Sequence, residues 1–414
     1  MRKPTSIAAL LALVLALGVA AGPAAWAGER PAAIKIGGTL AVTGAFAPEF
    51  GPGLLDFMKA WEKMINAEGG VFVKEYNAKL PLQLVVYDDE SNPEKSVELY
   101  ERLAAVDKVH AFLGPASSPI TLRASTVAER LKLPMLTGEA NSPLIYTRGF
   151  QWIVGVDRPA YFWSEHYINV LKDQRDKGRI DYKTIAFLIE DHPHTKDCGD
   201  GAQDLARKAG FQIVGVETVP FRTKDFSAAI ARFKGLNPDI LYVAAWTFTS
   251  VPFVKQAHEL GLKPKELHII HMLPEFIRDV GPQLAEGITG ETYLARRAMD
   301  ARLQAILKEM KVDDPYAFKS LVTYIRYLAM ETLRRGIEAA GTLDREKLIA
   351  ALRTNQFDMP YGPHRVNFNI QVGGRTLNGM GEKYLFAAQV QAGRITVVGP
   401  PRFADGEYRP SPRK

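Results

Sequence analysis

Two adjacent hydroxyl residues, Ser117 and Ser118, follow a glycine and a proline between an apolar stretch (109–113) and a predicted helix that ends near residue 131. The first N–H groups of a helix have no partner inside the helix, and serine hydroxyls donate hydrogen bonds. Such a loop can therefore hold an anion without a buried arginine. Capping of the helix by one of the serines is the structural alternative. We expect this loop to contact a carboxylate on a small solute.

Two histidine pairs and a single cysteine are also residue types that could carry chemistry. His192 and His194 form an H-x-H pattern, and His268 and His271 an H-x-x-H pattern. The further ligands of a metal site do not accompany either pair, so we expect no metal and no cofactor. We place His192 and His194 at the rim of a ligand pocket. Cys198 is the only cysteine, which excludes an internal disulfide, and we assign it no catalytic role.

The sequence carries no signature of an enzyme. Glycines 37, 38 and 44 lie within or after a predicted strand, but they lack the G-x-G-x-x-G spacing of a dinucleotide-binding loop. The G-x-S-x-G turn that presents a nucleophilic serine is absent as well. These patterns favour a binding protein over a catalyst.

The N-terminal segment has the layout of a signal peptide. Arg2 and Lys3 precede an apolar stretch (7–21), and Ala25-Trp26-Ala27 has the small-x-small pattern of a cleavage site. The apolar stretch is shorter than the ~20 residues of a spanning helix. We therefore expect residues 1–27 to be a signal peptide that is cleaved near Ala27, and the mature protein to be periplasmic.

Composition indicates a folded chain with more than one lobe. The hydrophobic share is 47% and the charged share 24%, which is typical of globular proteins. The 414 residues exceed what one hydrophobic core usually supports. The formal net charge is +6, but no run of five basic residues occurs, so we expect no nucleic-acid partner.

Predicted strands and helices alternate through two successive arrays, which indicates two parallel sheets flanked by helices. The first array has strands at 34–40, 82–87, 109–113 and 134–137, and the second at 184–189, 211–218, 240–244 and 268–271. After residue 287 the sequence predicts helices at 316–340 and 344–354 and strands at 362–369 and 384–390. The Pro-rich tail, 400–414, is expected to be loosely ordered.

Short motifs in a fixed order resemble the periplasmic Leu/Ile/Val-binding protein family, the type I solute-binding proteins of ABC importers. The resemblance covers nearly all of the chain after the predicted signal peptide. The motifs are IKIG (34–37), TGAF (43–46), INAEGGV (65–71), YDDESNP (87–93), GPASS (114–118), LTGEANSP (136–143), DFS (225–227) and YGP (361–363).

The resemblance implies a type I periplasmic-binding-protein fold, in which two α/β lobes are joined by a three-strand hinge. We expect one lobe to comprise 28–155 plus 291–372 and the other 156–290 plus 373–414. The hinge is then expected near residues 155–157, 287–292 and 372–378. The implied partners are a small-molecule ligand and an inner-membrane ABC permease with its ATPase, and the protein is expected to be a monomer.

The resemblance also assigns ligand contacts in the first lobe. Phe50 falls where the family places an aromatic residue against the ligand, although a core role is the alternative. Ala140 corresponds to a backbone contact, and Asn141 replaces a threonine hydroxyl with an amide that can both donate and accept. Glu139 stands where small residues or proline are usual. We interpret it as an exposed loop charge, with contact to a ligand cation as the alternative.

In the second lobe, Trp246 corresponds to an aromatic residue that closes on the ligand, and Glu275 to an acidic residue that pairs with a ligand ammonium. The Tyr-Gly pair that the family has near Cys198 is absent. The expected function is capture of a small carboxylate-bearing metabolite for an ABC importer, with an amino acid favoured. The alternatives are an aromatic or aliphatic acid or amide without an amine, or a sensor that presents its solute to a receptor.

Overall fold

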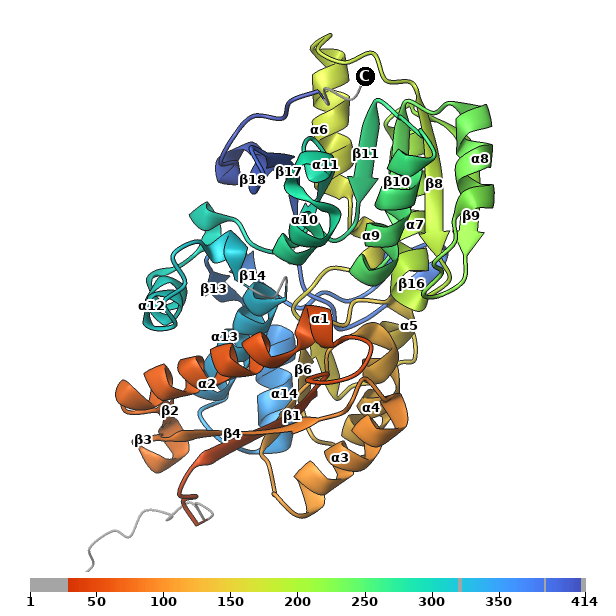
Figure 1. Ribbon diagram of the computed structural model, residues 1–414. Helices are drawn as coiled ribbons and strands as arrows, with labels where there is room; N and C mark the ends of the chain where they lie inside the picture. Colours follow the sequence, from red (N-terminus) through yellow and green to blue (C-terminus); the bar gives the residue numbers. More distant parts are fainter. Residues whose placement is uncertain (1–28, 319–321, 383–384, 411–414) are drawn as a thin grey trace, which may run out of the picture.

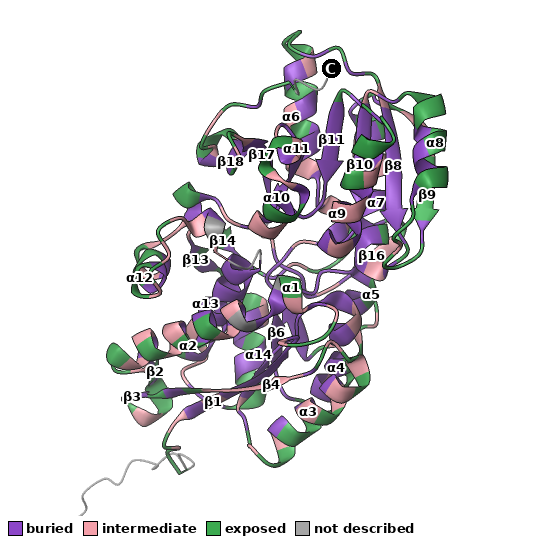
Figure 2. Cartoon of the chain, in the orientation of Figure 1, coloured by how far each residue is buried: buried purple, intermediate pink, exposed green. Residues whose placement is uncertain are grey.

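A computed structural model describes residues 29–318, 322–382 and 385–410, so the predicted signal peptide lies outside the described residues. Two lobes are stacked in Figure 1, each built around its own sheet. Sheet strands and the inner faces of the helices are buried in both lobes (Figure 2). The predicted α/β class with mostly parallel sheets is confirmed. Among the described helices, none is long and apolar enough to cross a membrane.

The first sheet is entirely parallel. Its strands run in the order β4 (Leu82–Asp88), β1 (Ile34–Leu40), β5 (Ala111–Leu113), β6 (Met135–Thr137) and β7 (Ile153–Gly155). Because parallel neighbours need crossover segments, helices connect most of these strands. They are α1 (Ala47–Phe50), α2 (Pro52–Ala67), α3 (Pro93–Ala105), α4 (Ser118–Leu131) and α5 (Pro143–Tyr146).

The second sheet has the order β18 (Arg394–Gly399), β17 (Phe386–Gln391), β12 (Thr289–Thr292), β11 (Glu266–Ile269), β10 (Ile240–Ala244), β8 (Thr184–Glu190) and β9 (Gln212–Val219). Only β17 and β18 run antiparallel to their neighbours. The helices of this lobe are α6 (Glu165–Asp176), α7 (Pro193–Lys208), α8 (Ser227–Leu236), α9 (Thr247–Glu259), α10 (Pro274–Val280) and α11 (Pro282–Ala285).

The segment after β12 returns to the first lobe before it ends in the second. It forms α12 (Ala301–Glu309), α13 (Thr323–Ala340), α14 (Arg345–Thr354) and the hairpins β13–β14 (Phe357–Met359, Gly362–His364) and β15–β16 (Ile370–Val372, Arg375–Leu377). The remaining hairpin, β2–β3 (Val71–Val73, Ala78–Leu80), follows α2. Asp344 caps α14, since its carboxylate accepts the Lys347 N–H.

Three expectations about the C-terminal third are wrong. Leu377 and Met380 pack with Ile153 and other residues of the first lobe, so residues 373–380 do not join the second. The helix predicted at 316–340 begins only at Thr323. The tail is not loose up to residue 410. Phe403 and Tyr408 are buried, and the Tyr408 hydroxyl donates to Glu266.

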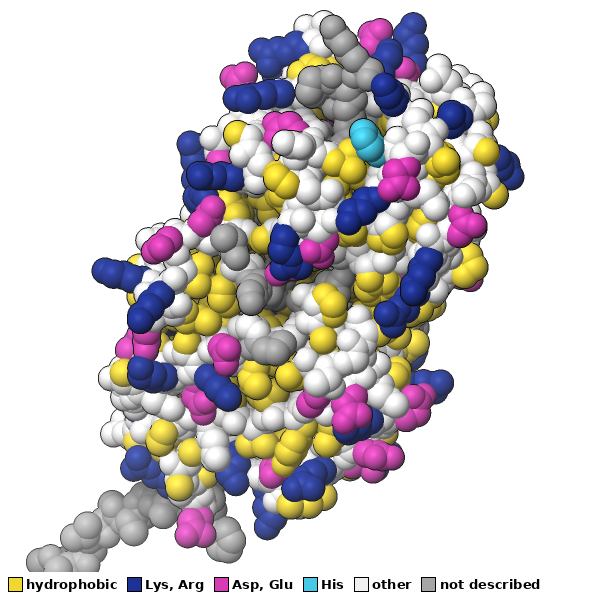
Figure 3. Space-filling view, in the orientation of Figure 1, with side chains coloured by type: hydrophobic (Ala, Val, Ile, Leu, Met, Phe, Trp, Pro, Cys, Tyr) yellow, Lys and Arg dark blue, Asp and Glu magenta, His cyan; other side chains and the backbone are white. Residues whose placement is uncertain are grey.

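Lysine and arginine are mixed with aspartate and glutamate over both lobes on the face shown in Figure 3. Neither sign of charge dominates that face.

Candidate functional site

A small cavity of about 20 Å³, the size of a single water molecule, lies between the two sheets. Phe50, Ser118 and Glu139 line it from the first lobe, and Trp163, His194, Trp246, His271 and Tyr293 from the second. Glu139, Trp246, His271 and Tyr293 lie one or two residues after a strand, at the carboxyl edge of one of the sheets, and Ser118 and His194 lie at the start of helices that follow a strand. Open α/β sheets bind their ligands at this edge.

The serine loop lies beside this cavity at the start of α4, and Ser118 lines it. Ser118 Oγ accepts the Ser142 N–H at 3.2 Å, which leaves its own proton free to donate. Ser117 is 1% exposed, and its hydroxyl has no hydrogen-bond partner among the described residues. Neither hydroxyl caps α4, so the capping alternative is wrong. Ser117 has a φ of 75°, a strained value for a non-glycine residue that is typical of functional sites.

Gly114 allows the two polar loops of the first lobe to lie together. A β-carbon at this position would stand 2.7 Å from the Thr137 β-carbon, at the end of β6. The serine loop and the loop with Asn141 therefore share one corner of the cavity.

Glu139 is not an exposed loop charge. Its side chain and that of Arg326, on α13, are each 1% exposed, and Arg326 Nε donates to Glu139 Oε1 at 2.7 Å. Arg326 also donates to the Gly114 carbonyl. Burial raises the pKa of Glu139, and the Arg326 charge opposes this rise. Glu139 Oε2 has no hydrogen-bond partner among the described residues, so the cavity wall keeps one free acceptor.

A polar chain crosses from the first lobe to the second. Asn141 Nδ2 donates to Asp157 at 2.8 Å, and Asn141 Oδ1 lies 3.0 Å from His194 Nδ1. His194 Nε2 lies 3.2 Å from His271 Nε2. Tyr293 completes the arrangement by donating its hydroxyl to Asp157 at 2.7 Å.

A second polar contact joins the lobes at their edge. The Ser142 hydroxyl donates to Asp197 on α7, and Arg375 of β16 lies 3.8 Å from the same carboxylate. Burial raises the pKa of Asp197 to about 6, because it favours the uncharged acid.

Burial lowers the pKa of a histidine, because it favours the neutral ring. It lowers the pKa of His192 to about 4 and that of His271 to about 3, and it holds the pKa of His194 well below its usual value. All three rings are therefore neutral at pH 7. Cys198 is buried inside α7, 3.7 Å from His194 Nε2, and burial raises the pKa of its thiol.

Aromatic rings close the remaining walls of the cavity. The Trp246 ring centroid lies 4.8 Å from that of His271, 5.3 Å from that of Phe46 and 6.1 Å from that of Phe50. Trp246 Nε1 donates to His192 Nδ1, which places His192 behind the tryptophan. The rings therefore give the site an apolar surface that lies beside the polar groups of both lobes.

The structure brings most of the predicted site residues together. Phe50, Ser118, Glu139, Trp246 and His194 line the cavity, and Ser117, Ala140, Asn141 and His192 are buried in the loops around it.

Glu275 is the exception, because it lies on α10 and is not among the lining residues. The sequence interpretation missed Trp163, His271, Tyr293 and Arg326 as site residues. The strand-end position of His271 and Tyr293 could have identified those two. Among the described residues, no three His, Cys, Asp or Glu side chains are placed to hold a metal ion.

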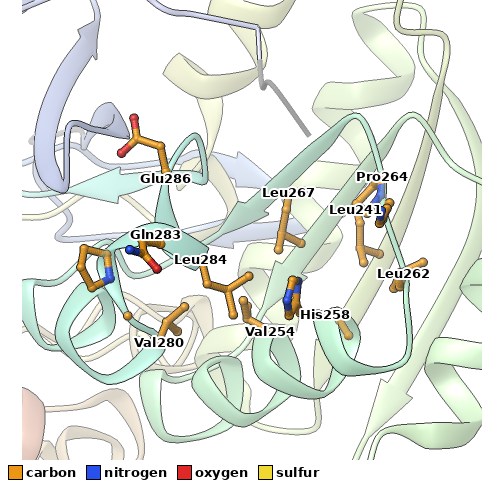
Figure 4. A pocket seen from close by; sticks show the side chains of 14 residues that line it. Leu241, Val254, His258, Leu262, Pro264, Leu267, Val280, Gln283, Leu284 and Glu286 are labelled. Carbon is orange, nitrogen blue, oxygen red and sulfur yellow. The ribbon is translucent and has the colours of Figure 1, made fainter. Parts of the chain in front are cut away.

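A larger hollow lies on the second lobe, away from these residues (Figure 4). Val254 and His258 of α9, Val280 and Leu284 line it, and Leu241 and Leu267 form its floor. Leu241 and Leu267 stand near the amino ends of β10 and β11, opposite the edge where such sheets bind ligands. The interlobe cavity is therefore the better candidate for the binding site.

Comparison with known proteins identifies the family. Residues 33–394 match the model of the periplasmic binding protein family. The chain belongs to this family. Periplasmic binding proteins bind solutes and are not enzymes, so the chain is a solute-binding protein and not a catalyst.

Relatives of this periplasmic binding protein include a Leucine-, isoleucine-, valine-, threonine-, and alanine-binding protein of Pseudomonas aeruginosa. It is 27% identical over 314 residues, which cover 72% of this chain and 77% of the relative. Among solved structures, a leucine-binding protein of Thermotoga maritima has a TM-score of 0.68 at 21% identity, with 88% and 98% of the two chains covered. An ABC-transporter solute-binding protein of Rhodopseudomonas palustris in complex with 3,4-dihydroxy benzoic acid has a TM-score of 0.70 at 19% identity, with 92% and 99% covered. The two structures share the fold of this chain.

Proposed function

We propose that this protein is the periplasmic component of an ABC importer and captures a small carboxylate-bearing solute between its lobes. One observation carries the proposal. The cavity combines the hydroxyl of Ser118, at the start of a 14-residue helix, with aromatic walls from the opposite lobe, and the unpaired hydroxyl of Ser117 is buried beside it. Hydroxyls at a helix start suit a carboxylate, and the aromatic walls suit the rest of a small molecule.

Closure of the lobes is the proposed mechanism. The solute binds the serine loop of the first lobe, and Trp246, His194 and His271 then close over it and exclude water. The closed form is the one that the membrane permease and its ATPase recognise. In this proposal the protein is exported, its signal peptide is removed near Ala27, and it acts as a monomer.

An amino acid is the favoured solute, because Glu139 Oε2 is a buried acceptor that can receive an ammonium N–H. Glu139 then takes the role that was expected of Glu275. The relatives named for amino acids support this choice. An acid without an amine is the second candidate, since Arg326 already balances the charge of Glu139.

Replacing Ser118 with alanine tests the carboxylate contact. We expect S118A to bind its best acid about 10- to 150-fold more weakly, because one hydrogen bond to a charged group contributes about 1.5–3 kcal/mol. Isothermal titration calorimetry with leucine, alanine and benzoate measures the affinity. T126A, an exposed position on the same helix, is the matched control and keeps the wild-type affinity. Equal affinities of S118A and wild type would contradict the assignment.

A further inference from the structure

The polar chain between the lobes ends on an atom without a partner. Its members are Asp157, Asn141, His194 and His271, none more than 4% exposed. His271 Nδ1 has no hydrogen-bond partner among the described residues, although His271 lines the cavity. A buried polar atom without a partner costs about 1–3 kcal/mol, so a group from the solute is the natural partner.

The first half of this polar chain, from Asp157 to His194, has one possible arrangement of its protons. The Asp157 carboxylate receives the Tyr293 hydroxyl and the Arg158 N–H as well as Asn141, so it is an acceptor only. Asn141 must therefore turn its NH2 group toward Asp157 and its carbonyl oxygen toward His194. Because that oxygen only accepts, His194 carries its proton on Nδ1.

The proton positions in the second half of the polar chain follow because the rings of His194 and His271 are both neutral. A neutral His194 with its proton on Nδ1 offers Nε2 as an acceptor. His271 Nε2, 3.2 Å away, must then carry a proton and donate it. Since burial keeps the pKa of His271 at about 3, the ring holds no second proton. His271 Nδ1 is thus a bare acceptor, fixed by contacts that begin at Asp157.

We infer that His271 is a specificity-determining residue that selects carboxylic acids with a second group able to donate an N–H or O–H hydrogen bond. A hydroxyl, an amide or an ammonium fits this requirement. A solute with only carbon atoms beyond its carboxylate leaves His271 Nδ1 buried without a partner. The inference rests on the proposed function, because it takes the interlobe cavity as the solute site.

Matched acids test this requirement on the full-length mature protein. One series is 4-methylpentanoate, 2-hydroxy-4-methylpentanoate and leucine, and another is benzoate with its 3-hydroxy and 4-hydroxy derivatives. Calorimetry is expected to give at least tenfold tighter binding for a donor-bearing member than for the plain acid of its series. Equal binding within both series overturns the inference but leaves the carboxylate proposal standing. Failure of every acid to bind overturns the proposed function, and this inference with it.

Variants at position 271 locate the effect. H271F removes the acceptor and should erase the preference for donor-bearing acids. H271N places an amide oxygen near the position of Nδ1 and should retain part of the preference. H258N, at an exposed histidine of the hollow on the second lobe, is the matched control and should retain the full preference for donor-bearing acids. A preference that survives in H271F overturns the inference.

A histidine-selective nitrogen NMR spectrum of the ligand-bound wild type gives an answer that does not depend on whether the variants fold. We expect His194 to be protonated on Nδ1 and His271 on Nε2. A proton on Nδ1 of His271 overturns the inference.

Discussion

Replacing Arg326 with methionine is expected to lower the free energy of unfolding by about 3–5 kcal/mol at pH 7, the usual effect of removing one partner of a buried ion pair. Arg326 and Glu139 are both almost fully buried, and Arg326 also satisfies the Gly114 carbonyl. Methionine fills the space but leaves Glu139 without its counter-charge in a low-dielectric environment. Urea unfolding, followed by tryptophan fluorescence, measures the loss.

Two further variants separate this effect from a packing effect. E139Q with R326M removes both charges and should be more stable than R326M alone. R130M breaks the exposed Arg130–Glu101 pair and should change the stability by less than about 1 kcal/mol. Unfolding free energies of R326M and wild type that agree within error would contradict a buried, charged pair.

The penalty of R326M should also depend on pH. Without Arg326, the pKa of Glu139 in the folded protein rises further above its unfolded value. A raised folded-state pKa stabilises the fold at low pH and loses that contribution as the pH rises through it. The stability gap between R326M and wild type should therefore narrow on acidification from pH 7 to pH 5.

The strands and the serine loop were predictable from the sequence because they depend on local patterns. The apolar stretch at 240–244 is β10 to the residue, and the serine loop follows β5 as expected. Because all strands of the first sheet are parallel, loops that follow its strands meet at one edge. This rule accounts for the contact between the serine loop and the loop that carries Asn141.

The buried ion pair was not predictable, because its two members are 187 residues apart in sequence. Glu139 has no charged neighbour within its own loop, so burial of its carboxylate had no local signal. Arg326 lies on α13, which is buried over most of its surface and therefore lacks a polar stripe that would distinguish an inward arginine.

His271 was missed because of a short boundary error. The sequence placed it inside a strand at 268–271, whereas β11 ends at Ile269. Two residues decide whether a side chain belongs to the sheet or to the loop that meets the ligand. Strand boundaries carry errors of this size, so a histidine near a strand end should be considered in both positions.

Ligand affinity is expected to fall roughly 10- to 100-fold between pH 7 and pH 5. The reason is that a histidine that must lose its proton when the lobes close weakens binding about tenfold for each pH unit below its ordinary pKa. If the lobes open as proposed, we expect His194 and His271 to regain water and to titrate near the ordinary histidine value. With the lobes in contact, as in this structure, burial lowers the pKa of His271 to about 3 and holds that of His194 well below its usual value. The lowered pKa values of His194 and His271 stabilise the closed form above about pH 6.5, the ordinary pKa of histidine. This stabilisation is lost as the pH falls toward the pKa values of the two histidines in the closed form.

Titration of Asp197 has the opposite effect on closure to titration of the histidines, and it therefore provides an internal test. Burial raises its pKa to about 6, so the closed form takes up a proton at this carboxyl and gains stability as the pH falls below 6. D197N removes this opposing contribution, and its affinity should fall more steeply on acidification than that of the wild type. H258N, at an exposed histidine, should follow the wild-type curve. Calorimetry at pH 7, 6 and 5, corrected for ionisation of the solute, measures these slopes. Unchanged or tighter wild-type binding at pH 5 would mean that the histidines do not change their exposure when the lobes close.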